Sequence, residues 1–136
     1  VNFVLSSLSM ARGGEIFVPK IPSMSTADLA RTMAPHLPHK VIGIRPGEKL
    51  HEIMIPEDDA RSTIELVDRF AILPAHGAKV TARYLATGGH LVPDGFSYAS
   101  NTNPEQLTDA ALRPLIGMAA EASAPRTAPV AFITRR

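Results

Sequence analysis

Prolines and glycines are spread along this chain and divide it into short elements. The 136 residues include 12 prolines and 9 glycines, which tend to end helices and strands because proline lacks a backbone donor and glycine loosens the backbone. Between these breaks, apolar periodicity predicts helices over residues 1–11, 25–34 and 104–116 and strands over residues 15–18 and 40–44. We therefore expect a small mixture of helices and strands.

The middle of the chain has weaker patterns. Residues 49–54 fit a short helix that Pro56 interrupts, and the acidic start of residues 57–61 favours another, because the helix dipole attracts carboxylates. Residues 63–67 and 70–73 carry strand-type side chains, although their pattern does not separate strand from helix.

The C-terminal part is rich in turn-forming residues. Residues 76–103 contain many glycines, serines, threonines and asparagines, and Pro-Asp-Gly at 93–95 is a turn signal. Beyond Gly117 the sequence has little to bury, so we predict a disordered tail over residues 118–136. No repeat or linker divides the remainder, which predicts one domain with a small core over residues 1–117.

The composition argues against several kinds of partner. With 14 basic and 13 acidic residues the net charge is +1, which gives no reason to expect a nucleic acid or an anionic membrane. Cysteine is absent, which excludes thiolate chemistry and suits a cytoplasmic location. No apolar run reaches the roughly 20 residues that a membrane span needs. His36 and His39 have a metal-site spacing, but Pro35 and Pro38 break the helix there, and we expect no metal.

The most informative segment is the turn Arg45-Pro46-Gly47-Glu48, which follows the predicted buried strand. Arginine presents a rigid fork of donors that fits phosphate oxygens, and a carboxylate three residues later can accept hydrogen bonds from vicinal hydroxyls. One turn can thus hold a diphosphate and a ribose. From spacing alone, however, the commoner interpretation is an ordinary turn, in which Arg45 and Glu48 pair with each other or face water.

Four blocks of the sequence resemble one enzyme family and occur in that family's order. They are residues 13–24 (GGEIFVPKIPSM), 42–52 (IGIRPGEKLHE), 55–61 (IPEDDAR) and 92–98 (VPDGFSY), the last followed by Asn101-Thr102-Asn103. These blocks are similar to the inverting UDP-N-acetylglucosamine 4,6-dehydratases, extended short-chain dehydrogenase/reductases of the polysaccharide-biosynthesis group. The resemblance runs from Val1 to about Gly117.

This resemblance implies both a fold and a function. The expected fold is α/β: the small mixed α+β substrate-binding lobe of the family, without its NADP-binding Rossmann domain. The family's lyase reaction oxidises the sugar at C4, eliminates water across C5 and C6, and returns the hydride to C6. The resemblance places Arg45 at the diphosphate and Glu48 at the ribose, and Lys49 and His51 also match the substrate-binding motif. It further implies a homo-oligomer for the parent enzyme.

Two features that the reaction needs are missing from the sequence. The glycine pairs at 13–14 and 88–89 do not form a Gly-x-x-Gly-x-x-Gly cradle, and there is no Tyr-x-x-x-Lys. We therefore expect no catalytic residue here: this chain binds the UDP-sugar, and an upstream Rossmann domain with NADP performs the chemistry. The alternative is a stand-alone, non-catalytic module that binds a nucleotide or a protein partner through its apolar first helix.

Overall fold

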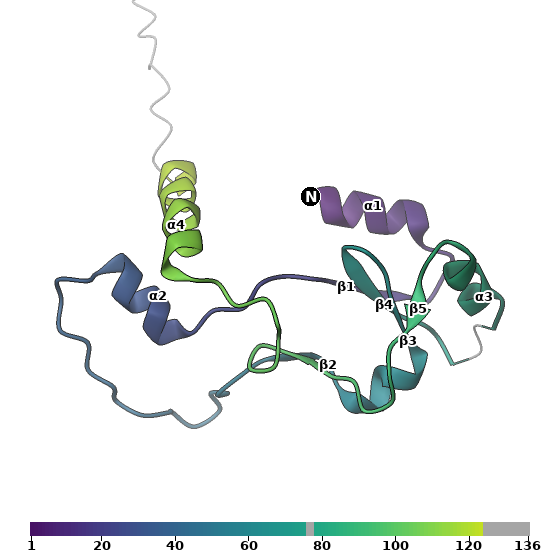
Figure 1. The fold of residues 1–136 in the computed structure, drawn as a ribbon, viewed down its shortest axis with the longest axis horizontal. Coiled ribbons are helices and arrows are strands. Elements are labelled where there is room, and N and C mark those ends of the chain that lie inside the picture. The colour runs from purple at the N-terminus through teal and green to yellow at the C-terminus, as the bar shows by residue number, and fades with distance from the viewer. Residues whose placement is uncertain (76–77, 124–136) are drawn as a thin grey trace, which may run out of the picture. The chain divides into compact units, whose positions relative to one another are not determined.

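The computed structural model describes residues 1–75 and 78–123 (Figure 1). Its described residues form two compact units, one within residues 1–23 and 41–106 and the other made of residues 24–40 and 107–123. The predicted fold class is confirmed, since the chain is a small mixed α/β structure with antiparallel sheets.

A four-stranded antiparallel sheet forms the centre of the larger unit, with strand order β1-β4-β3-β5. Its strands are β1 (Ile16–Pro19), β3 (Thr63–Glu65), β4 (Arg69–Ile72) and β5 (His90–Leu91). Both segments with ambiguous patterns are therefore strands, and they form a hairpin closed by the Leu66 N–H donating to the Arg69 carbonyl at 2.8 Å. Because β1 is an edge strand, it tolerates Pro19.

The core lies on both faces of this sheet. Ile64 and Ala71 are fully buried and pack with Leu73 and Tyr84, while Phe70 packs in a second cluster with other buried apolar side chains. Gly89 approaches this core closely, since a β-carbon there would lie 2.7 Å from the Ile64 Cγ2.

Helix α1 (Asn2–Met10) is held against the sheet by a buried arginine. Arg69 is 3% exposed, and its guanidinium donates to the Ser7 and Ser6 hydroxyls at 2.7 Å each. It also lies 4.6 Å from the centre of the Phe3 ring and pairs with the neighbouring Asp68 at 2.7 Å. The inner face of α1 is therefore fixed by polar bonds as well as by apolar packing.

Helix α3 (Ala78–Ala86) was not predicted, because the surrounding glycines and threonines suggested loop. Its Val80 and Tyr84, four residues apart, pack on the β3–β4 core. The Tyr84 hydroxyl bonds to the Met10 carbonyl at 3.3 Å and to the Glu15 carboxylate at 3.2 Å. Burial of one apolar face outweighs the weak local preference of this segment.

A second, two-stranded sheet pairs β2 (Ile53–Ile55) with β6 (Tyr98–Ala99), and the short helix η1 (Glu57–Ser62) follows β2. The helix predicted over residues 49–54 is wrong. The Glu52 N–H donates to the Ser100 hydroxyl at 3.0 Å, and the Ser100 N–H donates to the Glu52 carbonyl at 2.8 Å. Pairing with a distant segment uses the backbone groups that a helix would need.

The buried strand predicted over residues 40–44 is also wrong. In the structure this segment belongs to no strand, and Val41 and Ile42 are 92% and 72% exposed. An apolar run becomes a buried strand only where neighbouring strands and a covering layer exist, and the described residues offer this segment neither.

The smaller unit contains α2 (Thr26–Met33) and α4 (Asp109–Ser123). Helix α2 begins and ends close to its predicted positions, with the Ser25 hydroxyl accepting from the Ala27 N–H at 3.2 Å. The Thr32 hydroxyl on α2 donates to the Asp109 carboxylate on α4 at 3.0 Å. In the described part of the chain, no helix is long and apolar enough to span a bilayer.

The predicted start of the last helix at Pro104 is wrong, because α4 begins only at Asp109. Asn103 instead forms a local turn, in which its side-chain oxygen accepts from the Glu105 N–H at 3.1 Å. Helix α4 continues into the first residues of the predicted tail. Residues 124–136 lie outside the described residues, so the disorder predicted there stays a prediction.

Candidate functional site

The predicted Arg45–Glu48 turn is present and is built by local backbone chemistry. The Glu48 N–H donates to the Arg45 carbonyl at 3.0 Å, which closes a four-residue turn. Pro46 restricts the first central position, and Gly47 has φ 85° at the second, the pattern of a type II turn. Nothing lies within 4 Å of where a Gly47 β-carbon would be, so its backbone conformation, and not lack of space, requires glycine there.

The charged groups of this turn are exposed and face each other. The Arg45 and Glu48 side chains are 75% and 47% exposed, and the Arg45 Nε lies 3.1 Å from the Glu48 Oε1. The Glu48 Oε2 also accepts from the Arg45 backbone N–H at 2.8 Å. This mutual pairing is what the ordinary-turn interpretation predicts. The same groups also provide one arginine fork and one carboxylate within a few ångströms, both accessible to a ligand.

The other two predicted site residues follow this turn directly. Lys49 is 68% exposed and its ammonium lies 3.3 Å from the Glu52 carboxylate, while His51 is exposed. The backbone of Glu52 is bonded to Ser100, as described above, and this bond ties the end of the segment to β6. The segment that carries the four residues thus has a fixed C-terminal end and an exposed, apolar N-terminal approach through Val41 and Ile44.

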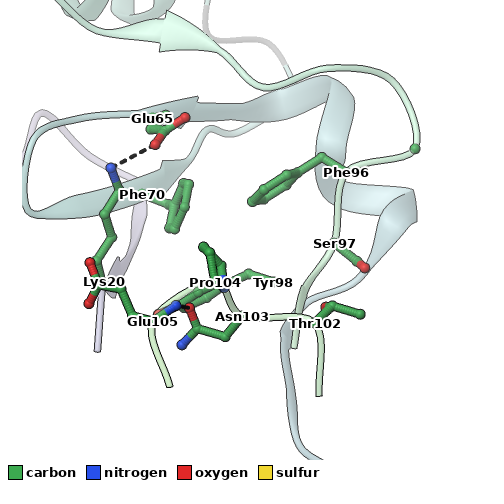
Figure 2. Close-up of a pocket in the computed structure, with 11 residues that line it drawn as sticks. Lys20, Glu65, Phe70, Phe96, Ser97, Tyr98, Thr102, Asn103, Pro104 and Glu105 are labelled. Atoms are coloured by element: carbon green, nitrogen blue, oxygen red, sulfur yellow. Dashed lines mark hydrogen bonds and ion pairs between the residues drawn. The ribbon is translucent and has the colours of Figure 1, made fainter. Parts of the chain in front are cut away.

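A separate hollow of about 510 Å³ lies in the larger unit. Figure 2 shows Phe70 and Phe96 as neighbours along it, their ring centres 5.2 Å apart, with the Lys20–Glu65 ion pair at one end. Its remaining lining comes from Gly95, Ser97, Tyr98 and residues 102–105, and none of the four predicted site residues lines it. The structure therefore does not bring the predicted residues and this hollow together in one site.

The ion pair at the hollow links three strands. The Lys20 ammonium on the β1 side lies 2.7 Å from one Glu65 oxygen on β3, and the His90 Nε2 on β5 lies 3.0 Å from the other. The hydrogen bond from Lys20 lowers the pKa of Glu65 against the opposing effect of burial, and the charge of Lys20 and the bond to His90 lower it further. Sequence patterns give no signal for this group, because Lys20 and Glu65 are 45 residues apart.

Tyr98, at the end of the last family-like block, has a structural role. It is 8% exposed, and its hydroxyl accepts from the Ile21 N–H and donates to the Ile21 carbonyl, both at 2.8 Å. The Asn103 side chain adds a bond to the same carbonyl at 2.8 Å and one to the Ser23 hydroxyl at 2.9 Å. These residues fix the segment after β1, which sets the position of Lys20.

The described residues do not fit a dinucleotide cofactor. The glycine pair at 13–14 follows α1 and precedes β1, and the pair at 88–89 follows α3 and precedes β5. A pyrophosphate cradle needs the reverse order, with a strand leading through glycines into a helix N-terminus. Among the same residues no group of three or more potential metal ligands comes together, and His39 instead bonds to the Ala34 carbonyl at 3.1 Å.

Comparison with known proteins gives a consistent set of relatives. Residues 1–74 match the family described as "Polysaccharide biosynthesis protein". An inverting UDP-N-acetylglucosamine 4,6-dehydratase from Campylobacter jejuni is 46% identical over 121 residues, which cover 85% of this chain and 36% of that enzyme. The enzyme of the same name from another strain of this species is 50% identical over 109 residues, or 76% of this chain and 33% of that enzyme.

A solved structure agrees with these matches. The X-ray structure of Pen from Bacillus thuringiensis matches this chain with a TM-score of 0.68 and 26% sequence identity. The matched region covers 85% of this chain and 35% of the Pen chain. The chain thus spans about one third of the length of the relatives that it matches, and in the dehydratases this is the C-terminal third.

Proposed function

Since this chain belongs to the polysaccharide biosynthesis protein family, we propose that it is the UDP-sugar-binding portion of a UDP-N-acetylglucosamine 4,6-dehydratase. In this proposal the chain acts in nucleotide-sugar and surface-polysaccharide biosynthesis but does not catalyse the reaction by itself. A Rossmann domain with NADP supplies the chemistry, and the parent enzyme is a cytoplasmic homo-oligomer. The four-block resemblance and the identity to two dehydratases support this assignment.

The observation that carries the proposal is the geometry of the Arg45–Glu48 turn. Its arginine is 75% exposed, so its guanidinium is accessible to phosphate oxygens. The type II backbone and the bonds between Glu52 and Ser100 hold the turn in place without using the arginine fork. We propose that Arg45 binds the diphosphate, that Glu48 binds the ribose hydroxyls, and that Lys49 and His51 contribute to the same site.

Titration calorimetry of the full-length protein with UDP-N-acetylglucosamine tests this assignment. Arg45→Ala removes a charge-assisted contact and should weaken binding by about 1.5–3 kcal/mol, which corresponds to about tenfold or more in Kd. Arg83→Ala is the matched control, because Arg83 is an exposed arginine on α3. Equal affinity of the wild type and Arg45→Ala would contradict the role of Arg45.

The alternative function, a stand-alone binding module, has one supporting observation. Val4, Leu5 and Leu8 on α1 are 57%, 59% and 68% exposed, and they form an apolar surface at helical spacing. A dehydratase portion that packs on a further domain would expose the same surface when taken alone. Turnover of UDP-N-acetylglucosamine by the full-length protein separates the two functions, because a binding module would show none.

A further inference from the structure

We propose that Glu48 is a specificity-determining residue, which makes the Arg45–Glu48 turn select a nucleotide over free phosphate or pyrophosphate. This inference rests on the proposed function, because it assumes that the turn binds the diphosphate and ribose of a nucleotide. It adds a second role for Glu48, in the state without ligand.

In the structure, the Glu48 carboxylate occupies two Arg45 donors that an incoming anion can use, the backbone N–H and the Nε. One oxygen accepts from the Arg45 backbone N–H at 2.8 Å, and the other lies 3.1 Å from the Arg45 Nε. A backbone N–H and a guanidinium that converge on two oxygens form a typical anion-binding arrangement. Glu48 therefore stands where a phosphate group would stand, tethered three residues from its partner.

A tethered carboxylate competes with any free anion. To bind at these two donors, phosphate or pyrophosphate must displace the Glu48 carboxylate, which then lies close to the new negative charge without a partner. If the anion binds at the other guanidinium N–H groups instead, it lies beside the Glu48 carboxylate, so either position brings two negative charges together. The effect is moderate, because the two side chains are 75% and 47% exposed and water screens their attraction. A free anion is thus bound more weakly than it would be by an exposed Arg45 without the Glu48 carboxylate beside it.

A nucleotide avoids this penalty because it brings hydroxyl groups. When its diphosphate displaces Glu48 from Arg45, the vicinal ribose hydroxyls can donate to the released carboxylate, so no charge is left unpaired. The exchange replaces one pair of hydrogen bonds with another. Selectivity for nucleotides then follows because the displaced Glu48 carboxylate gains hydrogen bonds from a ribose, which phosphate and pyrophosphate lack.

The backbone of the turn can remain in place during this exchange. The bond from the Glu48 N–H to the Arg45 carbonyl, at 3.0 Å, involves no side chain, and Gly47 keeps its φ of 85° whether or not the carboxylate moves. The C-terminal end is tied to Ser100 through Glu52. Only the Glu48 and Arg45 side chains need to rearrange.

The test is calorimetric titration of the full-length protein with UDP and, separately, with inorganic pyrophosphate, for the wild type and Glu48→Gln. Glu48→Gln keeps the shape but removes the competing charge. Pyrophosphate should bind about twofold to fivefold more tightly, the range expected for loss of an exposed ion pair. UDP should bind several-fold more weakly, because a neutral amide is a poorer acceptor for the hydroxyls than a carboxylate.

The matched control is Glu57→Gln, which makes the same change of charge at an exposed glutamate of η1. It should leave the preference for UDP over pyrophosphate unchanged. An equal gain in pyrophosphate affinity in Glu57→Gln would overturn the inference, because net charge alone would then explain it.

Other outcomes also separate the inference from the proposed function. If Glu48→Gln still binds UDP but its pyrophosphate affinity is unchanged, weaker or undetectable, the inferred competition between the Glu48 carboxylate and free anions is overturned. UDP affinity that is unchanged in Glu48→Gln overturns the transfer of Glu48 to the ribose. In both cases a large loss of UDP affinity in Arg45→Ala would leave the proposed function intact, whereas no loss in that variant would remove the proposed function itself.

Discussion

The sheet core and the Arg45–Glu48 turn belong to the same unit of the molecule, but the arginine of the core is buried and that of the turn is exposed. In the core, the buried Arg69 has its donors occupied by two serines and an aspartate, and Ile64 is fully buried. In the turn, Arg45 is 75% exposed and its charge is paired with that of Glu48. Arg69 thus has a buried, structural environment, whereas the guanidinium of Arg45 is accessible to a ligand.

This difference indicates where each kind of substitution should act. Removing a hydrogen-bond partner of the buried Arg69 leaves a buried donor unsatisfied, so changes near Arg69 should affect stability. An exposed pair contributes little to stability, so changes at the turn should affect ligand binding instead. In the proposed function, the sheet supports the site and the turn contacts the ligand.

The largest effect is expected from the core. Ile64→Ala removes a side chain that is 0% exposed and packs with Ala71, Leu73 and Tyr84. The cavity should lower the free energy of unfolding by about 2–5 kcal/mol, measured by urea denaturation of the full-length protein. A loss well below about 1 kcal/mol would show that the sheet core is not packed as described.

A smaller and different effect is expected from Gly47→Ala. Its φ of 85° strains an L-residue by about 1–2 kcal/mol, so the turn should relax and UDP affinity should fall by up to about tenfold. Gly88→Ala is the control, with φ 91° and equally open space after α3. It should carry the same strain without changing UDP affinity. Equal losses of UDP affinity in both variants would contradict a specific role for the turn.

The smallest effect is expected from acid. The bond from Lys20 lowers the pKa of Glu65 below its ordinary value of 4.5. The contribution of the ionised Glu65 to the free energy of unfolding is therefore complete above pH 4.5. That contribution should disappear as the pH falls through the lowered folded-state pKa. Urea denaturation between about pH 6 and about pH 3 should therefore show a steeper loss for the wild type than for Glu65→Gln. Identical slopes would mean that the ion pair at the hollow adds nothing.

Elements defined by neighbouring residues were predicted well. Helix α2 follows from the Ser25 cap and Pro35, and β1 from the residues between Gly14 and Pro19. The Arg45–Glu48 turn was predicted because proline and glycine restrict two adjacent backbone positions. In each case the signal and the structure it specifies lie within a few residues.

Elements that depend on distant partners were predicted poorly. Residues 49–54 were expected to be a helix, but Ser100 takes their backbone bonds, and α3 forms because Tyr84 packs on strands that precede it. The short spacing of Arg45 and Glu48 predicts that they can pair, whereas no local pattern links Lys20 with Glu65.

The sequence by itself thus determined the Arg45–Glu48 turn, the Ser25 cap and the family resemblance, because these depend on residue types at short spacing. Only the tertiary structure decided which apolar runs are buried, since burial requires a second surface. Val41 and Ile64 are both β-branched and apolar, yet one is 92% exposed and the other 0%. Ile64 has paired strands on both sides, and the described residues offer Val41 none.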